Sequence, residues 1–258
     1  MSSAPSRAQS APREPMGAGS ATLRSMRPID RVVQSLRRRR DAARVSSTAR
    51  RVRRESLTYL NFPELADIER CAREAPDGDF LECGIALGGS AILMASLLPG
   101  ERVMHGYDVF GMIPPPGPED PPTVHERYQV IASGQSAGIG GETYYGYRDN
   151  LYDEVVNHFA RFGQPVGERV KLYRGLFEDT LHPDFRISLA HLDCDWYEPV
   201  KLCLERIWPK LLPGAFVICD DYHSHGGARK AVDEFLAERP QLRDAGFGSG
   251  HLVLRRDG

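Results

Sequence analysis

Short apolar runs alternate with longer amphipathic segments from about residue 57 to the end of the chain. The apolar runs predict six strands, at residues 79–83, 103–108, 170–174, 187–193, 215–220 and near 251–255. The intervening segments have helical spacing, at 63–74, 89–98, 149–162, 198–211 and 227–238. This alternation predicts an α/β fold, namely a doubly wound, mainly parallel sheet with helices on both faces.

One long interval interrupts the alternation. Residues 109–148 are rich in Gly and Pro and include the runs IPPPGPEDPP and GQSAGIGG. An interval of this length without secondary structure is uncommon in a compact domain and most often serves a functional purpose. We therefore expect residues 109–148 to form an inserted lid or substrate-binding segment.

The first 54 residues differ from the remainder in composition and charge. They contain 14 arginines and three acidic residues, so their net charge is +11, whereas residues 55–258 carry −13. Residues 1 to about 25 are mostly Ser, Ala, Pro, Gly and Arg, a composition that predicts disorder. Apolar residues between 29 and 36 then follow helical spacing. We expect a basic, largely disordered arm at 1–54 that can include a helix, and a folded domain at 55–258.

A basic arm on an acidic domain has two interpretations. In the first, the arm binds RNA or another anionic surface. In the second, it is a solvated arm, or a pair of helices that supports the domain or a homo-oligomer. The second is favoured because no aromatic residue stands among the arginines to stack on bases.

The remaining bulk properties narrow the class of protein. The five cysteines have no C-x-x-C spacing, and three of them lie in apolar runs, so we expect buried free thiols. The longest apolar run, at 91–98, is far shorter than the roughly 20 residues of a membrane span. Since no signal segment is recognisable either, we expect a cytoplasmic protein.

The segment GDFLECGIALGGS, residues 78–90, is a strand followed by a glycine-rich turn and a helix. Gly84 and Gly88 allow close approach of a ligand at the carboxyl end of a strand, and Ser90 opens the helix. The spacing G-x-x-x-G-G differs from the G-x-G-x-x-G of dinucleotide sites, and Glu82 would repel a pyrophosphate. A carboxylate at Glu82 instead suits the ammonium of a methionyl group. The alternative is a tight structural turn.

Two further positions fit a nucleoside-bearing cofactor. Asp108 ends the second predicted strand, where a carboxylate can bind both ribose hydroxyls of either NAD or S-adenosylmethionine, or can simply cap the turn. In RGLFEDTLH, residues 174–182, Gly175 permits close backbone approach beside the adenine. Phe177 can lie against the adenine or fill the core.

The segments AHLDCDWYEP (190–199) and VICDDY (217–222) each end an apolar strand in carboxylates. Neighbouring parallel strands present such ends at one edge, so Asp193, Asp220 and Asp221 should converge. Three carboxylates repel one another without a cation, and oxygen ligands suit a hard divalent ion, which predicts Mg²⁺. The alternative is that one or two of these aspartates cap helices.

A methyl transfer to oxygen needs a base that removes the hydroxyl proton. Asp195 lies two residues beyond the first predicted ligand and is the first candidate. His223 and His225, just after the second carboxylate segment, are the alternatives.

The ordered series of segments resembles the macrocin O-methyltransferase family, over about residues 57 to 235. The segments are LTYL, GDFLECGIALGGSAILMA, YDVFG with its Pro-rich lid, GLFEDTLH, LDCDWYEP, CDDY and ARKAVDEF. The resemblance implies a Rossmann-like class I methyltransferase fold, S-adenosylmethionine as donor, Mg²⁺, and a sugar hydroxyl as acceptor. It places Asp193, Asp220 and Asp221 on the metal, Asp195 as base, and 82–90 with Asp108 around the donor. Tyr59, in LTYL, is a candidate for the active site or the core.

Two other classes of function remain as alternatives. An NAD-dependent oxidoreductase shares Asp108 and the sheet but leaves Glu82 and the aspartates unexplained. A nucleic-acid-binding module would act through the basic arm. The first hypothesis is therefore an S-adenosylmethionine-dependent O-methyltransferase whose partner is a small glycoside or a sugar polymer rather than a nucleic acid. Tyr144, Tyr145 and Tyr147 of the lid suit stacking on a sugar, or packing.

Overall fold

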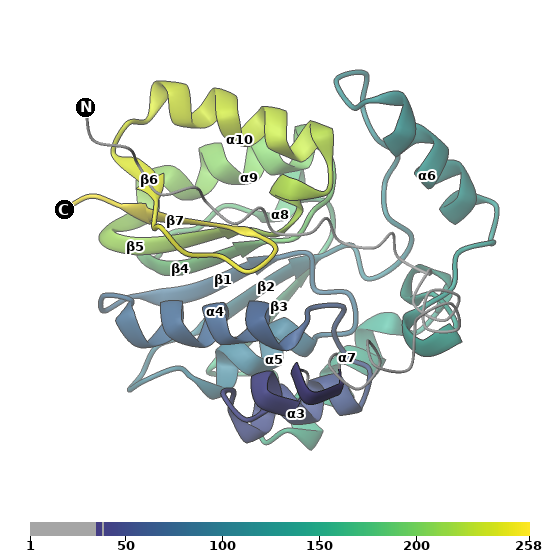
Figure 1. Cartoon of the computed structure of the whole chain (residues 1–258), viewed down its shortest axis with the longest axis horizontal. Helices are drawn as coiled ribbons and strands as arrows, with labels where there is room; N and C mark the ends of the chain where they lie inside the picture. The colour runs from purple at the N-terminus through teal and green to yellow at the C-terminus, as the bar shows by residue number, and fades with distance from the viewer. Residues whose placement is uncertain (1–34, 38) are drawn as a thin grey trace.

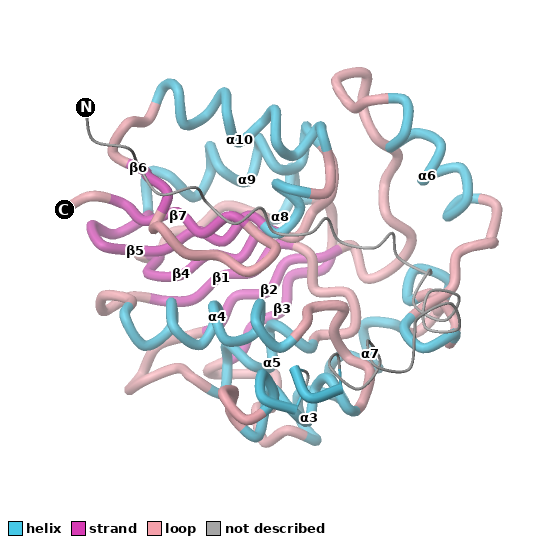
Figure 2. Tube along the Cα trace, in the orientation of Figure 1, coloured by secondary structure: helices cyan, strands magenta, loops and turns pink. Residues whose placement is uncertain are grey.

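The computed structural model describes residues 35–37 and 39–258. The disorder expected for residues 1 to about 25 lies outside the described residues. Seven strands form one sheet in the order β3-β2-β1-β4-β5-β7-β6, and the first five of these are mutually parallel (Figures 1 and 2). β7 pairs antiparallel with β5, and β6 antiparallel with β7. The predicted doubly wound, mainly parallel sheet is confirmed.

The strand and helix bounds follow the hydrophobic pattern closely. The strands are β1 (Asp79–Cys83), β2 (Met104–Asp108), β3 (Val170–Arg174), β4 (Ile187–Leu192), β5 (Leu211–Cys219), β6 (Leu242–Asp244) and β7 (Leu252–Arg256). The helices are α3 (Ser47–Arg54), α4 (Phe62–Glu74), α5 (Gly89–Ser96), α6 (Pro122–Ala132), α7 (Leu151–Arg161), α8 (Phe177–Thr180), α9 (Tyr197–Ile207) and α10 (Gly226–Glu238). β6 was not predicted, because three residues with one buried side chain give no alternating pattern.

Helices cover both faces of the sheet, and each face has its own apolar core. α9 and α10 lie on one side and α3, α4, α5 and α7 on the other (Figure 1). The sides alternate along β1: Phe80 packs in the core beneath α4 and α5, and Leu81 packs in the core beneath α9 and α10. This alternation decides which β1 side chains can reach a ligand at the edge of the sheet.

The packed part of the chain begins before residue 55. Val45, Ala49 and Val52 are buried in the core that also contains the α5 side chains. Ser46 caps α3 by accepting a hydrogen bond from the backbone N–H of Ala49 at 3.1 Å. The boundary expected after residue 54 therefore assigns α3 to the arm, whereas its apolar face belongs to the folded domain.

The interval 109–148 is more structured than its composition suggests. It contains α6, which stands beside the sheet in Figure 1, and two short 3₁₀ turns, Ile139–Gly141 and Tyr145–Tyr147. Tyr144 is 1% exposed, and the Tyr147 hydroxyl donates to the carbonyl of Ile131 at 2.6 Å. The expectation of a structureless interval is wrong, because tyrosine side chains supply the apolar surface that Gly and Pro lack.

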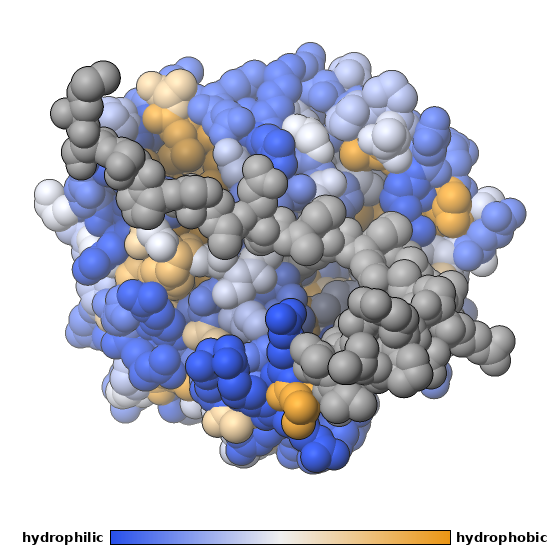
Figure 3. All heavy atoms as spheres, viewed as in Figure 1, coloured by the Kyte–Doolittle hydropathy of each residue, from blue (hydrophilic) through white to orange (hydrophobic). Residues whose placement is uncertain are grey.

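The rest of the surface agrees with a water-exposed domain. Figure 3 shows a mainly hydrophilic face with small, separate apolar areas. All five cysteines are buried free thiols, as predicted. Among the described residues, no helix is both long enough and apolar enough to span a membrane.

Candidate active site

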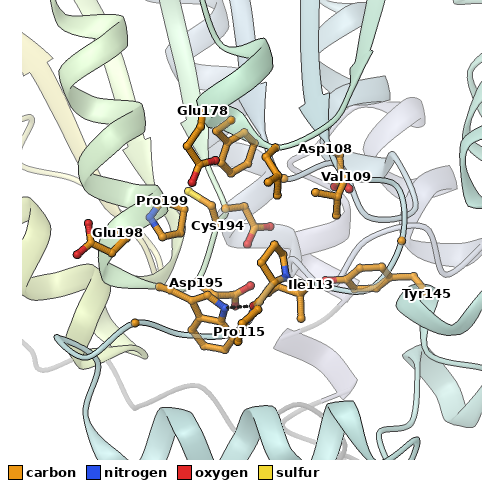
Figure 4. A pocket seen from close by; sticks show the side chains of 18 residues that line it. Asp108, Val109, Ile113, Pro115, Tyr145, Glu178, Cys194, Asp195, Glu198 and Pro199 are labelled. Atoms are coloured by element: carbon orange, nitrogen blue, oxygen red, sulfur yellow. Dashed lines mark hydrogen bonds between the residues drawn. The ribbon is translucent and has the colours of Figure 1, made fainter.

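A cavity of about 340 Å³ lies at the carboxyl ends of β1, β2 and β4, where parallel α/β sheets bind ligands. Side chains from these strand ends and from the lid converge on it in Figure 4. The lining residues are Gly84, Asp108, Val109, Gly111, Ile113, Pro114, Pro115, Gly117, Tyr145, Leu176, Phe177, Glu178, Asp193, Cys194, Asp195, Trp196, Glu198 and Pro199. The walls are mostly apolar, and carboxylates stand among them.

Glycine is required where the turn after β1 meets the end of β4. Gly84 has φ 90°, and a Cβ atom there would lie 1.8 Å from the carbonyl oxygen of Asp193. The two backbones are joined because the Asp193 N–H donates to the carbonyl of Cys83 at 2.9 Å. Gly84 therefore lets the loop close against the first predicted metal ligand.

Asp108 holds the same turn from the end of β2. Its carboxylate accepts hydrogen bonds from the backbone N–H groups of Ile85 at 2.6 Å, Ala86 at 3.0 Å and Phe110 at 2.5 Å. Burial raises the pKa of Asp108, and the three N–H donors oppose that rise. The structure thus shows the turn-capping role, while Asp108 also lines the cavity.

Several residues expected at the cofactor lie outside this cavity. Gly88, Ser90 and Gly175 are absent from its lining, and Gly88 packs beside α7 instead. Glu82 is fully buried, and its carboxylate accepts a hydrogen bond from Nδ1 of His191 at 2.6 Å. The reason is strand alternation: Leu81 packs on the side of α9 and α10, so the side chain of the next residue, Glu82, projects from the opposite face, toward α4 and α5. In this structure Glu82 therefore contacts His191 and does not line the cavity, and its contact with the donor stays a prediction.

The three predicted metal ligands do converge. Asp193, Asp220 and Asp221 each offer a carboxylate oxygen within 4.8 Å of the others, and we call them the carboxylate cluster. Asp193 follows β4, and the other two open a 3₁₀ turn, Asp220–His223, directly after β5. That turn lets adjacent residues both aim at one point, which an ideal strand would prevent.

The carboxylates of this cluster repel one another electrostatically. Burial, together with the neighbouring charges of Asp220 and Asp221, raises the pKa of Asp193 well above its ordinary value. Such a set of oxygen donors fits a hard dication such as Mg²⁺.

Asp195 and His225 adjoin the carboxylate cluster. Asp195 has φ 59°, and its backbone N–H donates to the Asp221 carboxylate at 3.1 Å. Burial, and then the charge of Asp221, raise the pKa of Asp195 to about 7. His225 Nδ1 lies 3.0 Å from Oδ1 of Asp221, and its Nε2 lies 3.9 Å from Oδ1 of Asp195. A carboxylate that titrates near neutral pH is suited to accepting a proton.

The two candidate histidines occupy different places. Burial lowers the pKa of His225, but the hydrogen bond with Asp221 and the charges of the neighbouring aspartates together outweigh burial and raise that pKa to about 9. His223 is exposed and lies edge-on to the ring of Tyr222. The 3₁₀ turn carries His223 outward, whereas His225 is the histidine beside Asp195. The choice of base stays a prediction.

Sequence reasoning missed the residues that attach the lid to the site. Trp196 Nε1 donates to the carbonyl of Pro114 at 2.9 Å, and the Tyr197 N–H donates to Asp120 at 3.0 Å. The only available signal was the WY pair after LDCD. Tyr59 and Tyr145 meet edge to face at 6.4 Å between ring centroids, and burial raises the pKa of Tyr59 to about 12.

A second group of ligating side chains was also missed. His191, Asp220 and His251 each offer an atom within 4.8 Å of the others, and all three are buried; we call them the imidazole cluster. Nothing in the spacing of residues 191 and 251 links them. The one signal in the sequence was that each of two predicted strands, 187–193 and the one near 251–255, contains a histidine among apolar residues.

The macrocin O-methyltransferase family model matches residues 61–244. The demethyldecarbamoylnovobiocin O-methyltransferase of Streptomyces niveus is 27% identical over 196 residues, which are 70% of this chain and 68% of that protein. The 8-demethyl-8-(2,3-dimethoxy-alpha-L-rhamnosyl)-tetracenomycin-C 4'-O-methyltransferase of Streptomyces olivaceus is 29% identical over 193 residues, 69% of this chain and 67% of that protein.

Among solved structures, the O-methyltransferase NovP has a TM-score of 0.64 at 24% identity, covering 78% of this chain and 83% of that chain. This likeness shows a shared fold. The family match spans most of the chain, from the start of α4 to the end of β6. It favours the O-methyltransferase hypothesis over an NAD-dependent oxidoreductase. The chain belongs to the macrocin O-methyltransferase family, a family of class I S-adenosylmethionine-dependent transferases.

Proposed function

We propose that this protein transfers the methyl group of S-adenosylmethionine to a sugar hydroxyl of a natural-product glycoside or a polysaccharide, with Mg²⁺ held by the carboxylate cluster. The observation that carries the proposal is the convergence of three carboxylates beside a cavity at the carboxyl edge of the sheet. Family membership supplies the reaction class. The names of two relatives, which act on a novobiocin precursor and a rhamnosyl-tetracenomycin, supply the class of acceptor.

The cavity has the chemistry that an adenosine-bearing donor requires. Its volume of about 340 Å³ is at the lower end of small-molecule sites, which span roughly 300–1,000 Å³. Val109, Leu176 and Phe177 offer apolar surface for an adenine, and Asp108 stands at the strand end where a carboxylate can bind ribose hydroxyls. Gly84, which lines the cavity and has no side chain, would leave room for the methionyl portion.

The donor set of the carboxylate cluster fits Mg²⁺. All of its side-chain ligand atoms are oxygens, and a dication would remove the repulsion that raises the pKa of Asp193. Bound there, Mg²⁺ would orient the acceptor hydroxyl and lower its pKa.

The protein's own residues then complete the reaction. Asp195 is placed to accept the hydroxyl proton while the acceptor oxygen bonds to the methyl carbon and the sulfur–carbon bond breaks. The products are the methyl ether, S-adenosylhomocysteine and a proton on Asp195. His225 lies against Asp221 and near Asp195, so it positions the base rather than contacting the acceptor. The segment 109–148, attached through the hydrogen bond between Trp196 and Pro114, would limit the access of water to the cavity once the substrates are bound.

Methyl transfer from labelled donor to a panel of glycosides tests the proposal. We expect EDTA to abolish the reaction and Mg²⁺ to restore it, and Asp193→Asn to lower kcat/KM by at least about 100-fold. Asp153→Asn, on the exposed face of α7, is the matched control and should retain the wild-type rate.

The same panel separates the alternatives. A rate in Asp193→Asn equal to wild type, or a rate untouched by EDTA, would overturn the metal assignment. In a thermal-shift assay S-adenosylhomocysteine should raise Tm and NAD should not. A rise with NAD alone would contradict the donor.

A further inference from the structure

The imidazole cluster lies on the face of the sheet that carries α4, and it shares Asp220 with the carboxylate cluster. His191 is on β4, Asp220 follows β5, and His251 directly precedes β7. These three strands are neighbours: His191 pairs with Ile218 of β5, and Cys219 pairs with Leu252 of β7. Residues 220 and 251 therefore lie side by side just beyond that last pair, and His191 lies two residues further from the sheet edge. His191 and His251 are 0% and 1% exposed, so the cluster is sealed from solvent.

Both imidazole nitrogens face the carboxylate of Asp220, but at distances longer than a direct hydrogen bond. Nε2 of His191 lies 3.8 Å from Oδ1 of Asp220, and Nδ1 of His251 lies 3.6 Å from the same oxygen. Neither nitrogen has a hydrogen-bond partner. Direct hydrogen bonds would require about 2.7–3.2 Å. Buried polar atoms are almost always satisfied, so three ligand atoms at such separations need an explanation.

The far side of each imidazole has its own carboxylate. Nδ1 of His191 donates to Glu82 at 2.6 Å, and Nε2 of His251 lies 3.4 Å from Oδ2 of Asp67 on α4. A carboxylate behind a histidine fixes the ring and leaves the opposite nitrogen free to coordinate, which is the usual arrangement around metal-bound histidines. It occurs here twice in one cluster.

We propose that the imidazole cluster is a second metal site, which takes a transition-metal dication such as Zn²⁺ on His191 Nε2, His251 Nδ1 and Asp220. Zn–ligand bonds of about 2.0–2.1 Å in a tetrahedral site place ligand atoms about 3.3–3.4 Å apart, which is only a few tenths of an ångström less than the two nitrogen–oxygen separations of 3.8 and 3.6 Å here. Two imidazoles and one carboxylate are donors that suit Zn²⁺ or Fe²⁺ better than Mg²⁺.

Charge supports the same assignment. Glu82, Asp67 and Asp220 place three carboxylates around two imidazoles where there is little or no exposure to water. Burying uncompensated charge is costly, and a dication offsets it. Since Asp220 belongs to both clusters, an ion in the buried site would also fix one ligand of the Mg²⁺ site. The buried ion therefore has a structural role: it ties β4, β5 and β7 together beneath the reaction centre.

Metal analysis of the full-length protein tests the site without any reliance on activity. The protein is purified, dialysed against buffer with Mg²⁺ and without added zinc, and its zinc content is measured by mass spectrometry. We expect about one zinc per chain, retained through dialysis because the site is buried. Replacement by Co²⁺ should give visible absorption bands typical of low-coordinate cobalt with nitrogen ligands.

Variants assign the ion to its cluster. His251→Gln and His191→Gln should reduce the zinc content and the Co²⁺ absorption at least tenfold, and Asp193→Asn should leave both unchanged. His223→Gln, on an exposed histidine, is the matched control. Circular dichroism verifies folding; if His191→Gln does not fold, His251→Gln carries the test.

The proposal is overturned by a protein that holds no zinc and gives no Co²⁺ absorption, which would mean that protons alone compensate the buried charge. It is equally overturned if zinc is lost in Asp193→Asn and kept in His251→Gln, because the ion then belongs to the carboxylate cluster. Neither outcome depends on methyl transfer, so failure here is distinguishable from failure of the proposed function.

Discussion

The carboxylate cluster and the imidazole cluster share Asp220 and differ in almost everything else. The first offers only oxygens and includes Asp193, a cavity-lining residue. The second offers two imidazole nitrogens and is sealed beneath α4. An ion that must exchange and meet an acceptor needs the first environment, and an ion that holds strands together needs the second. Position relative to the sheet edge, rather than residue type alone, therefore decides what a polar side chain can do.

Asp220→Asn should have the largest effect, because Asp220 belongs to both clusters. We expect methyl transfer near background, and a loss of about 3–5 kcal/mol in the free energy of unfolding, because buried partners lose their counter-charge. Chemical denaturation and a labelled-donor assay measure the two effects. Normal activity with normal stability would contradict the shared role of this residue.

Asp195→Asn should affect only the cavity side. Loss of a general base costs typically about 10²–10⁴-fold in rate, so kcat should fall by that amount while KM for the donor changes little. Zinc content should stay at the wild-type value. A higher KM for the acceptor with an unchanged kcat would show that Asp195 orients the acceptor rather than accepting its proton.

The pH dependence of stability should differ with and without Mg²⁺. In EDTA the folded state binds extra protons at Asp195, with a pKa of about 7 against an ordinary 3.8, and at His225, with about 9 against 6.5. Both contributions are present at low pH and are lost as pH rises, from about 4 to 7 for Asp195 and from about 6.5 to 9 for His225.

Thermal melts between pH 5 and pH 9 check this sign. Tm in EDTA should fall with rising pH, and the fall should flatten when Mg²⁺ replaces the protons. His225→Gln should remove the upper part of the slope. A Tm that rises with pH in EDTA would contradict the raised pKa values of Asp195 and His225 in the folded state.

Phe177→Ala should produce the smallest effect and sharpen the comparison. If the ring stacks on the donor's adenine, its loss should weaken S-adenosylhomocysteine binding about 3- to 10-fold, as expected for a contact of roughly 0.5–1.5 kcal/mol. Isothermal titration measures the change, and zinc content should not move. Unchanged affinity with a lowered Tm would instead show that Phe177 fills the core, where it also packs.

The sequence predicted the sheet and the convergence of the aspartates for clear reasons. Strands β1 and β3 have the predicted bounds. β1 is a short run of mostly buried side chains, and β3 is an edge strand in which apolar and charged residues alternate. The positions of Asp193 and Asp220 follow from the rule that parallel strands end at one edge. Glu82 was predicted correctly as part of the strand 79–83, but the prediction of a ligand contact did not take into account which face of the sheet its side chain occupies, and in the structure that side chain meets His191.

By itself the sequence determined which segments form strands and helices, which family the chain belongs to, and which carboxylates stand at the edge of the sheet. These depend on local periodicity and on ordered motifs. Only the tertiary structure decided that α3 belongs to the core, that His225 rather than His223 faces Asp195, and that His191 meets His251. Those outcomes depend on the turn after β5 and on strand register between residues 60 positions apart, which side-chain packing fixes and no local pattern encodes.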